Sequence, residues 1–196
     1  MLQFYTILDY EKGSSKRYNN CIEYYNCIKK EKLIKHKKGT YNYSNLGYIL
    51  LGTLIETITD TTYKEFVNNN ILKPLKMNHS GFDKTNTKLY KFNMKKLTKF
   101  QNNQIYNALS AGGLKSSVSD FIKFKNFHKL LKKQSILLLK KTYFFKYNKK
   151  DKIYIIKHNG GIIGGRSDLI FKYNTDWVCK DITIKLSTNF HGMLLY

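Results

Sequence analysis

The 196-residue sequence predicts an α+β fold in which helices come first and the strands of a sheet come last. From about residue 19 to residue 150, apolar side chains recur at helical spacings of three and four positions between capping and stop signals. From 151 to 196 the pattern changes to short runs rich in Ile, Tyr and Phe, separated by Gly-rich or Asn-Thr-Asp turns. No repeat and no Pro-rich or Gly/Ser-rich linker interrupts this order, so we expect a single domain, 1–196.

Two helices are expected near the start. The first covers about 19–32 and carries lysines on its polar face, and the second covers 45–59 and is expected to be largely buried. The apolar residues at helical spacing are Cys21, Tyr24, Tyr25 and Ile28 in the first helix and Leu46, Ile49, Leu50, Leu54 and Ile58 in the second.

Capping signals place the next helices. Thr62-x-x-Glu65 has capping-box spacing and opens an amphipathic helix that Pro74 ends. Ser117-x-x-Asp120 opens another, and a short helix is expected over about 135–141. Between them, 80–104 is polar and indicates a loop with a short strand near Phe92. Strands are expected over 153–157, 162–172 and 177–187.

The net charge of +22 comes almost entirely from lysine, because only Arg17 and Arg166 are arginine. Bidentate readout of phosphate or guanine favours arginine over lysine. Lys, Asn, Ile, Tyr and Phe are abundant while Ala, Arg and Pro are scarce, which is typical of an A+T-rich coding sequence. We therefore expect no nucleic acid as a partner, although a basic protein that binds nucleic acid or a membrane surface stays an alternative.

Composition also bears on metals, cofactors and membranes. The three cysteines form no disulfide framework or Cys-x-x-Cys pair, and no two of the five histidines lie at i, i+4, so we expect no metal and no cofactor. The longest apolar stretch, 48–55, is far below the ~20 residues needed for a membrane span. Residues 1–11 lack the basic and apolar regions of an export signal, and the sequence leaves the compartment open.

Two polar motifs stand out from this background. Tyr43-Ser44-Asn45 places a phenol and a carboxamide two residues apart at the start of the second helix, and His158-Asn159-Gly160-Gly161 lies in the strand region. In this order they resemble the second and third active-site motifs of the serine β-lactamase and DD-peptidase (penicillin-binding-protein-like) superfamily, in its class C-like branch of β-lactamase-related esterases and peptidases. Further segments that resemble this family are Lys73-Pro74-Leu75-Lys76-Met77, Ala111-Gly112-Gly113-Leu114 and Leu186-Ser187-Thr188-Asn189.

The resemblance implies a fold and a chemistry. The fold is an antiparallel sheet flanked by helices with a helical subdomain, and the chemistry is acyl transfer through a serine ester. Tyr43 would be the base, which requires nearby cations because an unperturbed tyrosine has a pKa of about 10. Asn45 would bind the substrate amide, and His158 would assist Tyr43 or bind a substrate carboxylate. Gly160 and Gly161 would admit substrate to a strand edge, with the Gly161 amide as an oxyanion donor.

The family nucleophile lies in Ser-x-x-Lys, and no serine in this chain has lysine three residues later. The resemblance therefore implies a chain that lacks the N-terminal strands and the nucleophile helix. Such a chain is expected to be inactive alone, to aggregate or need a partner, and to work with a separate N-terminal fragment that carries Ser-x-x-Lys. A non-catalytic protein that binds peptide or cell-wall ligands is the alternative. The choice among β-lactam, D-amino-acid peptide and ester substrates stays open.

Overall fold

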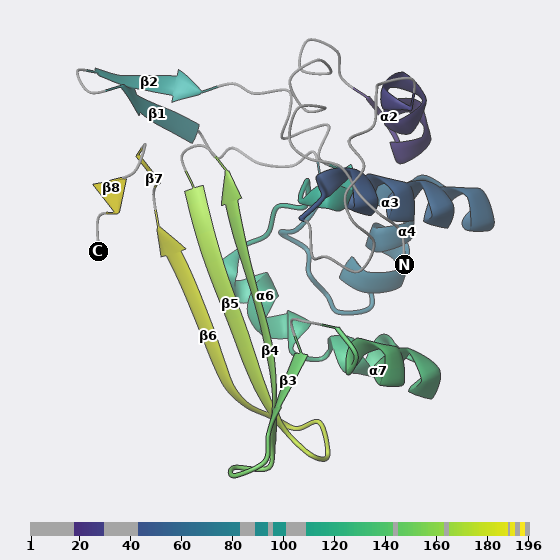
Figure 1. Ribbon diagram of the computed structural model, residues 1–196, viewed down its shortest axis with the longest axis vertical. Helices are drawn as coiled ribbons and strands as arrows, with labels where there is room; N and C mark the ends of the chain where they lie inside the picture. The colour runs from purple at the N-terminus through teal and green to yellow at the C-terminus, as the bar shows by residue number, and fades with distance from the viewer. Residues whose placement is uncertain are drawn as a thin grey trace. The chain divides into compact units, whose positions relative to one another are not determined.

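The structure, a computed structural model, describes residues 18–29, 43–82, 89–93, 96–100, 109–142, 145–162, 165–187, 189–190 and 193–194. The chain divides into two compact units, each assembled from several segments. Unit 1 comprises Met1–Pro74, His79–Thr85 and Asn102–Ser116, and unit 2 comprises Leu75–Asn78, Asn86–Gln101 and Ser117–Tyr196. Helices of the first part and a sheet from the last part are both present, so the predicted α+β class is confirmed (Figure 1).

Unit 1 is built from helices that begin at side-chain caps. Asn20 caps α2 (Cys21–Ile28), Ser44 caps α3 (Asn45–Thr59), and Thr62 forms the predicted capping box with Glu65 at α4 (Tyr63–Val67). A π-helical turn, η1 (Asn68–Leu72), extends α4, and a 3₁₀ turn, η2 (Leu109–Ala111), lies further along the chain. The predicted bounds of α3 are confirmed, and the residues predicted for the first helix beyond 29 lie outside the described ones.

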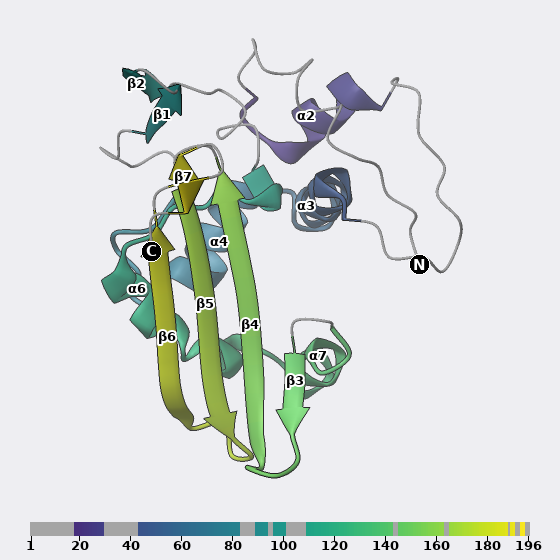
Figure 2. The ribbon, with the colours of Figure 1, turned by 60° about the vertical axis from the view of Figure 1, so that its left-hand side comes forward.

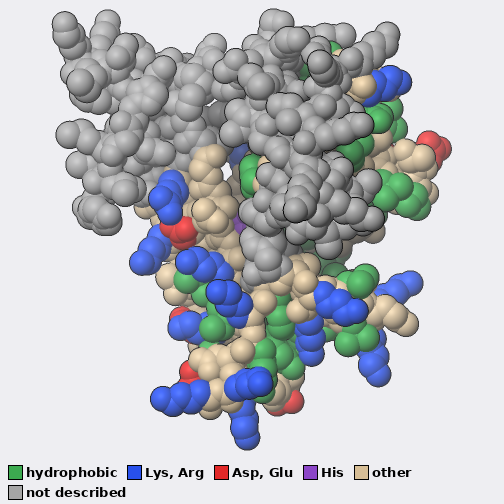
Figure 3. All heavy atoms as spheres, in the orientation of Figure 1, with side chains coloured by type: hydrophobic (Ala, Val, Ile, Leu, Met, Phe, Trp, Pro, Cys, Tyr) green, Lys and Arg blue, Asp and Glu red, His purple; other side chains and the backbone are tan. Residues whose placement is uncertain are grey.

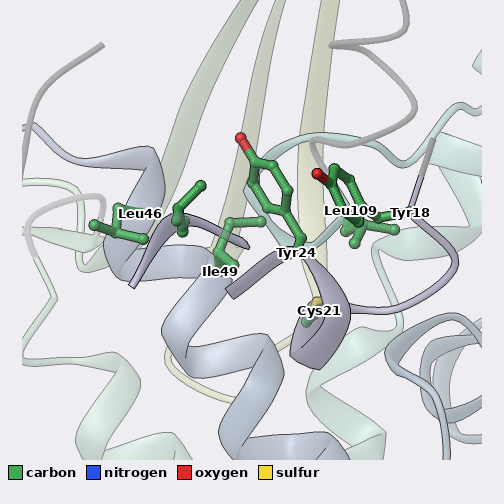
Figure 4. Packing of buried hydrophobic residues seen from close by; sticks show 7 residues of the cluster. Tyr18, Cys21, Tyr24, Leu46, Ile49 and Leu109 are labelled. Carbon is green, nitrogen blue, oxygen red and sulfur yellow. The ribbon is translucent and has the colours of Figure 1, made fainter. Parts of the chain in front are cut away.

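The core of unit 1 forms where α2, α3 and η2 meet (Figure 4). Its buried residues are Tyr18, Cys21, Tyr24, Ile28, Leu46, Ile49 and Leu109. Gly52 allows the close approach, since a Cβ at this position would stand 2.6 Å from the Cys21 sulfur and even nearer to the Ser110 hydroxyl. Burial raises the pKa of the Cys21 thiol to about 11, so this residue packs as a small apolar side chain.

A buried carboxylate joins three helices of unit 1. Glu56, on α3, is 4% exposed, and it accepts hydrogen bonds from the backbone amides of Cys21 and Ile22 at 2.9 Å each. It also accepts the amide of Tyr63 at 2.8 Å. These amides belong to the first turns of α2 and α4, where no intrahelical acceptor is available. Glu56 therefore satisfies both helix N-termini at once.

The prediction that α3 is largely buried is wrong for one side of the helix. Leu51 is 49% exposed, Leu54 53% and Ile58 73%. The buried side of the helix contains Leu46 and Ile49, as predicted, together with Gly52 and Glu56. A search for large apolar residues does not find Gly52 or Glu56. The exposed apolar stripe Leu51, Leu54 and Ile58 will be called the α3 stripe. Its residues lie at i, i+3 and i+7, the spacing of a face that packs against another element.

Unit 2 is built on a four-stranded antiparallel sheet in the order β3 (Phe145–Asn148), β4 (Ile153–Ile162), β5 (Gly165–Asn174) and β6 (Cys179–Ser187). Helix α6 (Val118–Phe124), capped by Ser117 as predicted, covers one face (Figure 2), where Phe124 contacts Phe171 at 6.1 Å between ring centroids. A 3₁₀ turn, η3 (Phe127–Leu130), and a short helix, α7 (Lys133–Leu139), follow. Two small hairpins complete the unit, β1 (Leu89–Asn93) with β2 (Lys96–Phe100) and β7 (Asn189–Phe190) with β8 (Met193–Leu194).

The strands depart from the sequence prediction in two ways. β4 continues through Gly160 and Gly161, which lie between the strands predicted over 153–157 and 162–172, and both residues pair in register with Ser167 and Arg166 of β5. β3 was not predicted, since its four residues mix aromatic and polar types over too short a length to show alternation. The strand expected near Phe92 is β1, and its partner β2 was not predicted.

Candidate active site

The Tyr43-Ser44-Asn45 motif lies at the N-terminal end of α3, in unit 1. Ser44 is buried and its hydroxyl accepts the Gly47 amide at 3.1 Å, which fixes the first turn of the helix. On either side of this cap, the Tyr43 hydroxyl donates to the carboxamide oxygen of Asn45 at 2.9 Å. Tyr43 is 56% exposed, so its hydroxyl group is both oriented and reachable from solvent.

The position of this pair has an electrostatic consequence. The unpaired amides at the start of a helix carry a partial positive charge, and α3 is 15 residues long. A negative charge that develops on a phenol oxygen, or a carboxylate of a bound molecule, is favoured at this place. The N-terminus of α3 thus favours negative charge beside the Tyr43–Asn45 pair.

His158, Gly160 and Gly161 lie on β4, in unit 2. His158 pairs with Leu169 and Gly160 with Ser167, so both lie on the sheet face that carries Phe171 and Tyr173. A Cβ at Gly160 would stand 3.1 Å from the Ser167 hydroxyl, whereas a Cβ at Gly161 would meet nothing within 4 Å. Glycine at 160 therefore keeps space beside Ser167, and Gly161 borders open space.

The same half of β4 forms a sheet edge. β3 pairs only with Ile153–Ile156, and among the described strands none continues beside 157–162 on that side. An antiparallel strand edge of this kind offers backbone donors and acceptors to an extended ligand. The histidine and the two glycines therefore lie where an extended molecule can pair with the backbone.

The structure accordingly places the predicted site residues in two groups. Tyr43 and Asn45 are joined by a hydrogen bond in unit 1, and His158, Gly160 and Gly161 share a strand in unit 2. Sequence reasoning passed over Ser167, because its position beside Gly160 follows only from the β4–β5 register. In the described part of the chain, no group of three His, Cys, Asp or Glu side chains is arranged to hold a metal ion.

Comparison with known families gives a match to the family model described as Beta-lactamase over residues 23–149. Among curated proteins, the chain is 43% identical over 56 residues to the protein flp of Staphylococcus aureus strain N315. This alignment covers 28% of the chain and 11% of that relative.

Solved structures show the same fold over most of the chain. FmtA from Staphylococcus aureus superimposes with a TM-score of 0.69 at 22% identity, covering 98% of this chain and 56% of that one. The D-amino acid amidase from Ochrobactrum anthropi SV3 gives a TM-score of 0.64 at 17% identity, covering 96% of this chain and 62% of that one. The chain thus has the β-lactamase/transpeptidase fold and spans little more than half the length of these structures.

Proposed function

We propose a function on the premise that this chain belongs to the Beta-lactamase family, whose model matches residues 23–149. The chain supplies the C-terminal portion of a serine hydrolase that transfers an acyl group from a β-lactam, a D-amino-acid peptide or an ester. The observation that carries the proposal is the Tyr43–Asn45 hydrogen bond of 2.9 Å at the N-terminus of α3. It presents a phenol and a carboxamide as one oriented pair.

In the proposed reaction Tyr43, as the phenolate, removes the proton from a serine hydroxyl as the serine oxygen bonds to the substrate carbonyl carbon. Tyr43 then returns that proton to the amine or alcohol, which leaves as its bond to the acyl carbon breaks. Asn45 binds the amide of the substrate through its donor and acceptor groups. His158 supplies a hydrogen bond or positive charge to the phenol or to a substrate carboxylate, and the Gly161 amide stabilises the oxyanion. The described edge of β4 supports this assignment, because an extended substrate can align there by backbone hydrogen bonds.

The serine must come from outside the residues of this chain, which contains no Ser-x-x-Lys. We propose that a second polypeptide segment of the same fold supplies it on a helix. The α3 stripe supports this step, since Leu51, Leu54 and Ile58 form an apolar helix face whose side chains are 49–73% exposed.

The test combines the chain with a polypeptide that carries the Ser-x-x-Lys helix of a solved relative and measures acylation by a fluorescent penicillin. We expect no labelling of either piece alone and labelling of the serine in the mixture. Tyr43→Phe should reduce the labelling rate by about a thousandfold, as expected for the loss of a general base. Asn45→Ala should also lower the labelling rate, with little change in the melting temperature of the chain.

Controls distinguish catalysis from binding. Tyr48→Phe, on the same helix and 39% exposed, should leave labelling unchanged. Saturable binding of the penicillin without a covalent product would favour the non-catalytic alternative. Equal labelling of the wild-type mixture and the Tyr43→Phe mixture would overturn the assignment of Tyr43.

A further inference from the structure

A long segment of unit 2 carries positive charge and no negative charge. Between Phe121 and Lys150 the sequence contains ten lysines and neither Asp nor Glu. An A+T-rich coding sequence accounts for abundant lysine but does not remove acidic residues from one segment of a chain that has 13 elsewhere. Asp120 and Asp151 flank the segment, and Asp120 pairs with Lys123 at 2.8 Å, so the lysines that remain, including Lys133, Lys140 and Lys141, give the segment a local positive field.

Helix α7, Lys133–Leu139, lies in the middle of this segment and has apolar residues on two sides. Ile136 and Leu139 are half-buried, whereas Leu137 is 54% exposed and Leu138 65%. Lys133 precedes Leu137 by one helical turn, Lys141 lies in the turn that follows the helix, and both lysines are exposed. Two exposed leucines are thus bordered by lysines along the helix, and Figure 3 shows green apolar side chains among blue ones where α7 lies in Figure 1.

Aromatic side chains continue this surface toward the sheet. The Lys140 ammonium lies 4.6 Å from the centre of the Tyr154 ring and donates to its hydroxyl at 3.2 Å. Tyr154 in turn contacts Tyr147 and Trp177, with ring centroids at 5.2 and 5.3 Å. Tyrosine and tryptophan beside lysine are residues that suit the boundary between water and lipid.

We propose that this surface, comprising Leu137, Leu138, Lys133, Lys140 and Lys141 and here called the α7 surface, docks on an anionic lipid bilayer. The two leucines enter the headgroup region and the lysine ammonium groups meet lipid phosphates. Charge and apolar surface together favour lipid. The lysines favour an anionic partner, and the exposed leucines favour one with an apolar layer beneath its charged groups. An anionic bilayer provides both.

The test measures binding of the full chain to vesicles of equal parts phosphatidylglycerol and phosphatidylcholine, and to vesicles of phosphatidylcholine alone. Trp177, the only tryptophan, serves as the fluorescent reporter. We expect binding to the anionic vesicles at least about tenfold tighter than to the neutral ones, weakening as salt increases. The pair Leu137→Ser and Leu138→Ser should weaken binding by about tenfold at an unchanged melting temperature.

Matched charge variants make the site specific. Lys133→Gln with Lys141→Gln should weaken vesicle binding several-fold. Lys157→Gln with Lys185→Gln removes the same charge from exposed positions of β4 and β6 and should leave binding nearly unchanged. Equal losses from the two lysine pairs, or no loss from the leucine pair, would overturn the proposal. So would tighter binding to a single-stranded oligonucleotide that the same α7 variants abolish, since the partner would then be nucleic acid.

Discussion

His128 occupies an unusual position for a histidine in a basic segment. Its ring stacks on Trp177 with centroids 5.6 Å apart and planes inclined by 25°, and it meets Tyr173 edge-on. Its Nδ1 lies 3.1 Å from the Lys125 carbonyl oxygen, to which it donates, and Tyr173 donates to the same oxygen at 2.8 Å. Burial, together with the positive charge of Lys129, holds the His128 pKa below its usual value.

Acid should therefore weaken unit 2 through His128. Because the pKa is lower in the folded protein than in the unfolded one, the neutral ring contributes stability fully above about pH 6.5. That contribution is lost as the pH falls through the folded pKa. We expect the free energy of unfolding, measured by urea titration with circular dichroism, to fall from pH 7 to pH 5. His128→Gln should flatten this decrease, because its carboxamide can donate to Lys125 without titrating.

The control for this prediction is His79→Gln, which changes a histidine of unit 1 and leaves the ring contacts of His128 in place. An undiminished decrease in His128→Gln would contradict the prediction.

Trp177, on which the His128 ring stacks, has a strained backbone. It adopts a φ of +60°, a region that residues with a Cβ rarely occupy. The packing of its ring against Tyr154, Tyr173 and His128 offsets this strain.

At the scale of elements, Glu56 is the residue that holds α2, α3 and α4 together. We expect Glu56→Gln to lower the stability of unit 1 by about 1–3 kcal/mol, because one of its oxygen acceptors becomes an amide donor facing a backbone N–H. Hydrogen exchange should show the cause directly. Glu56 accepts hydrogen bonds from the backbone amides of Cys21, Ile22 and Tyr63, and these amides should exchange faster in the variant.

The matched control is Glu65→Gln on α4. Glu65 is exposed and closes the capping box with Thr62 alone. Glu65→Gln should therefore cause a smaller loss of stability than Glu56→Gln, confined to α4. Protection of the three amides that is unchanged in Glu56→Gln would show that other groups hold these helices together.

Local sequence signals made the helices predictable. The course of β4 and the role of Glu56 depend on contacts between distant parts of the chain and could not be predicted. Ser44, Thr62 and Ser117 each cap a helix where the sequence indicated a start, because capping depends on residues within one turn. The position of Tyr43 and Asn45 at the start of α3 was predictable for the same reason, whereas the hydrogen bond between them was not predicted. The course of β4 through Gly160 depends on register with β5, which lies outside any local window. The role of Glu56 likewise depends on residues 34 and 35 positions earlier in the chain.

At the scale of the whole molecule, the chain spans 56% of the FmtA structure and carries an apolar stripe that its described residues leave exposed. Fully burying an exposed leucine or isoleucine side chain stabilises a protein by roughly 1.5–3 kcal/mol. Further burial of these three partly exposed side chains therefore favours a partner segment or self-association. No helix among the described residues is long and apolar enough to cross a membrane.

The α3 stripe and the α7 surface should act independently of each other. The triple change Leu51→Ser, Leu54→Ser and Ile58→Thr should make the chain alone more monodisperse in analytical ultracentrifugation, because it removes exposed apolar area. The same change should lower penicillin labelling in the mixture with the Ser-x-x-Lys polypeptide by at least about tenfold, while vesicle binding persists. The pair Leu137→Ser and Leu138→Ser should lower vesicle binding, while penicillin labelling in the mixture persists. Loss of both properties in both variants would mean that the leucines act only through general stability, and the two surfaces would then have no separate roles.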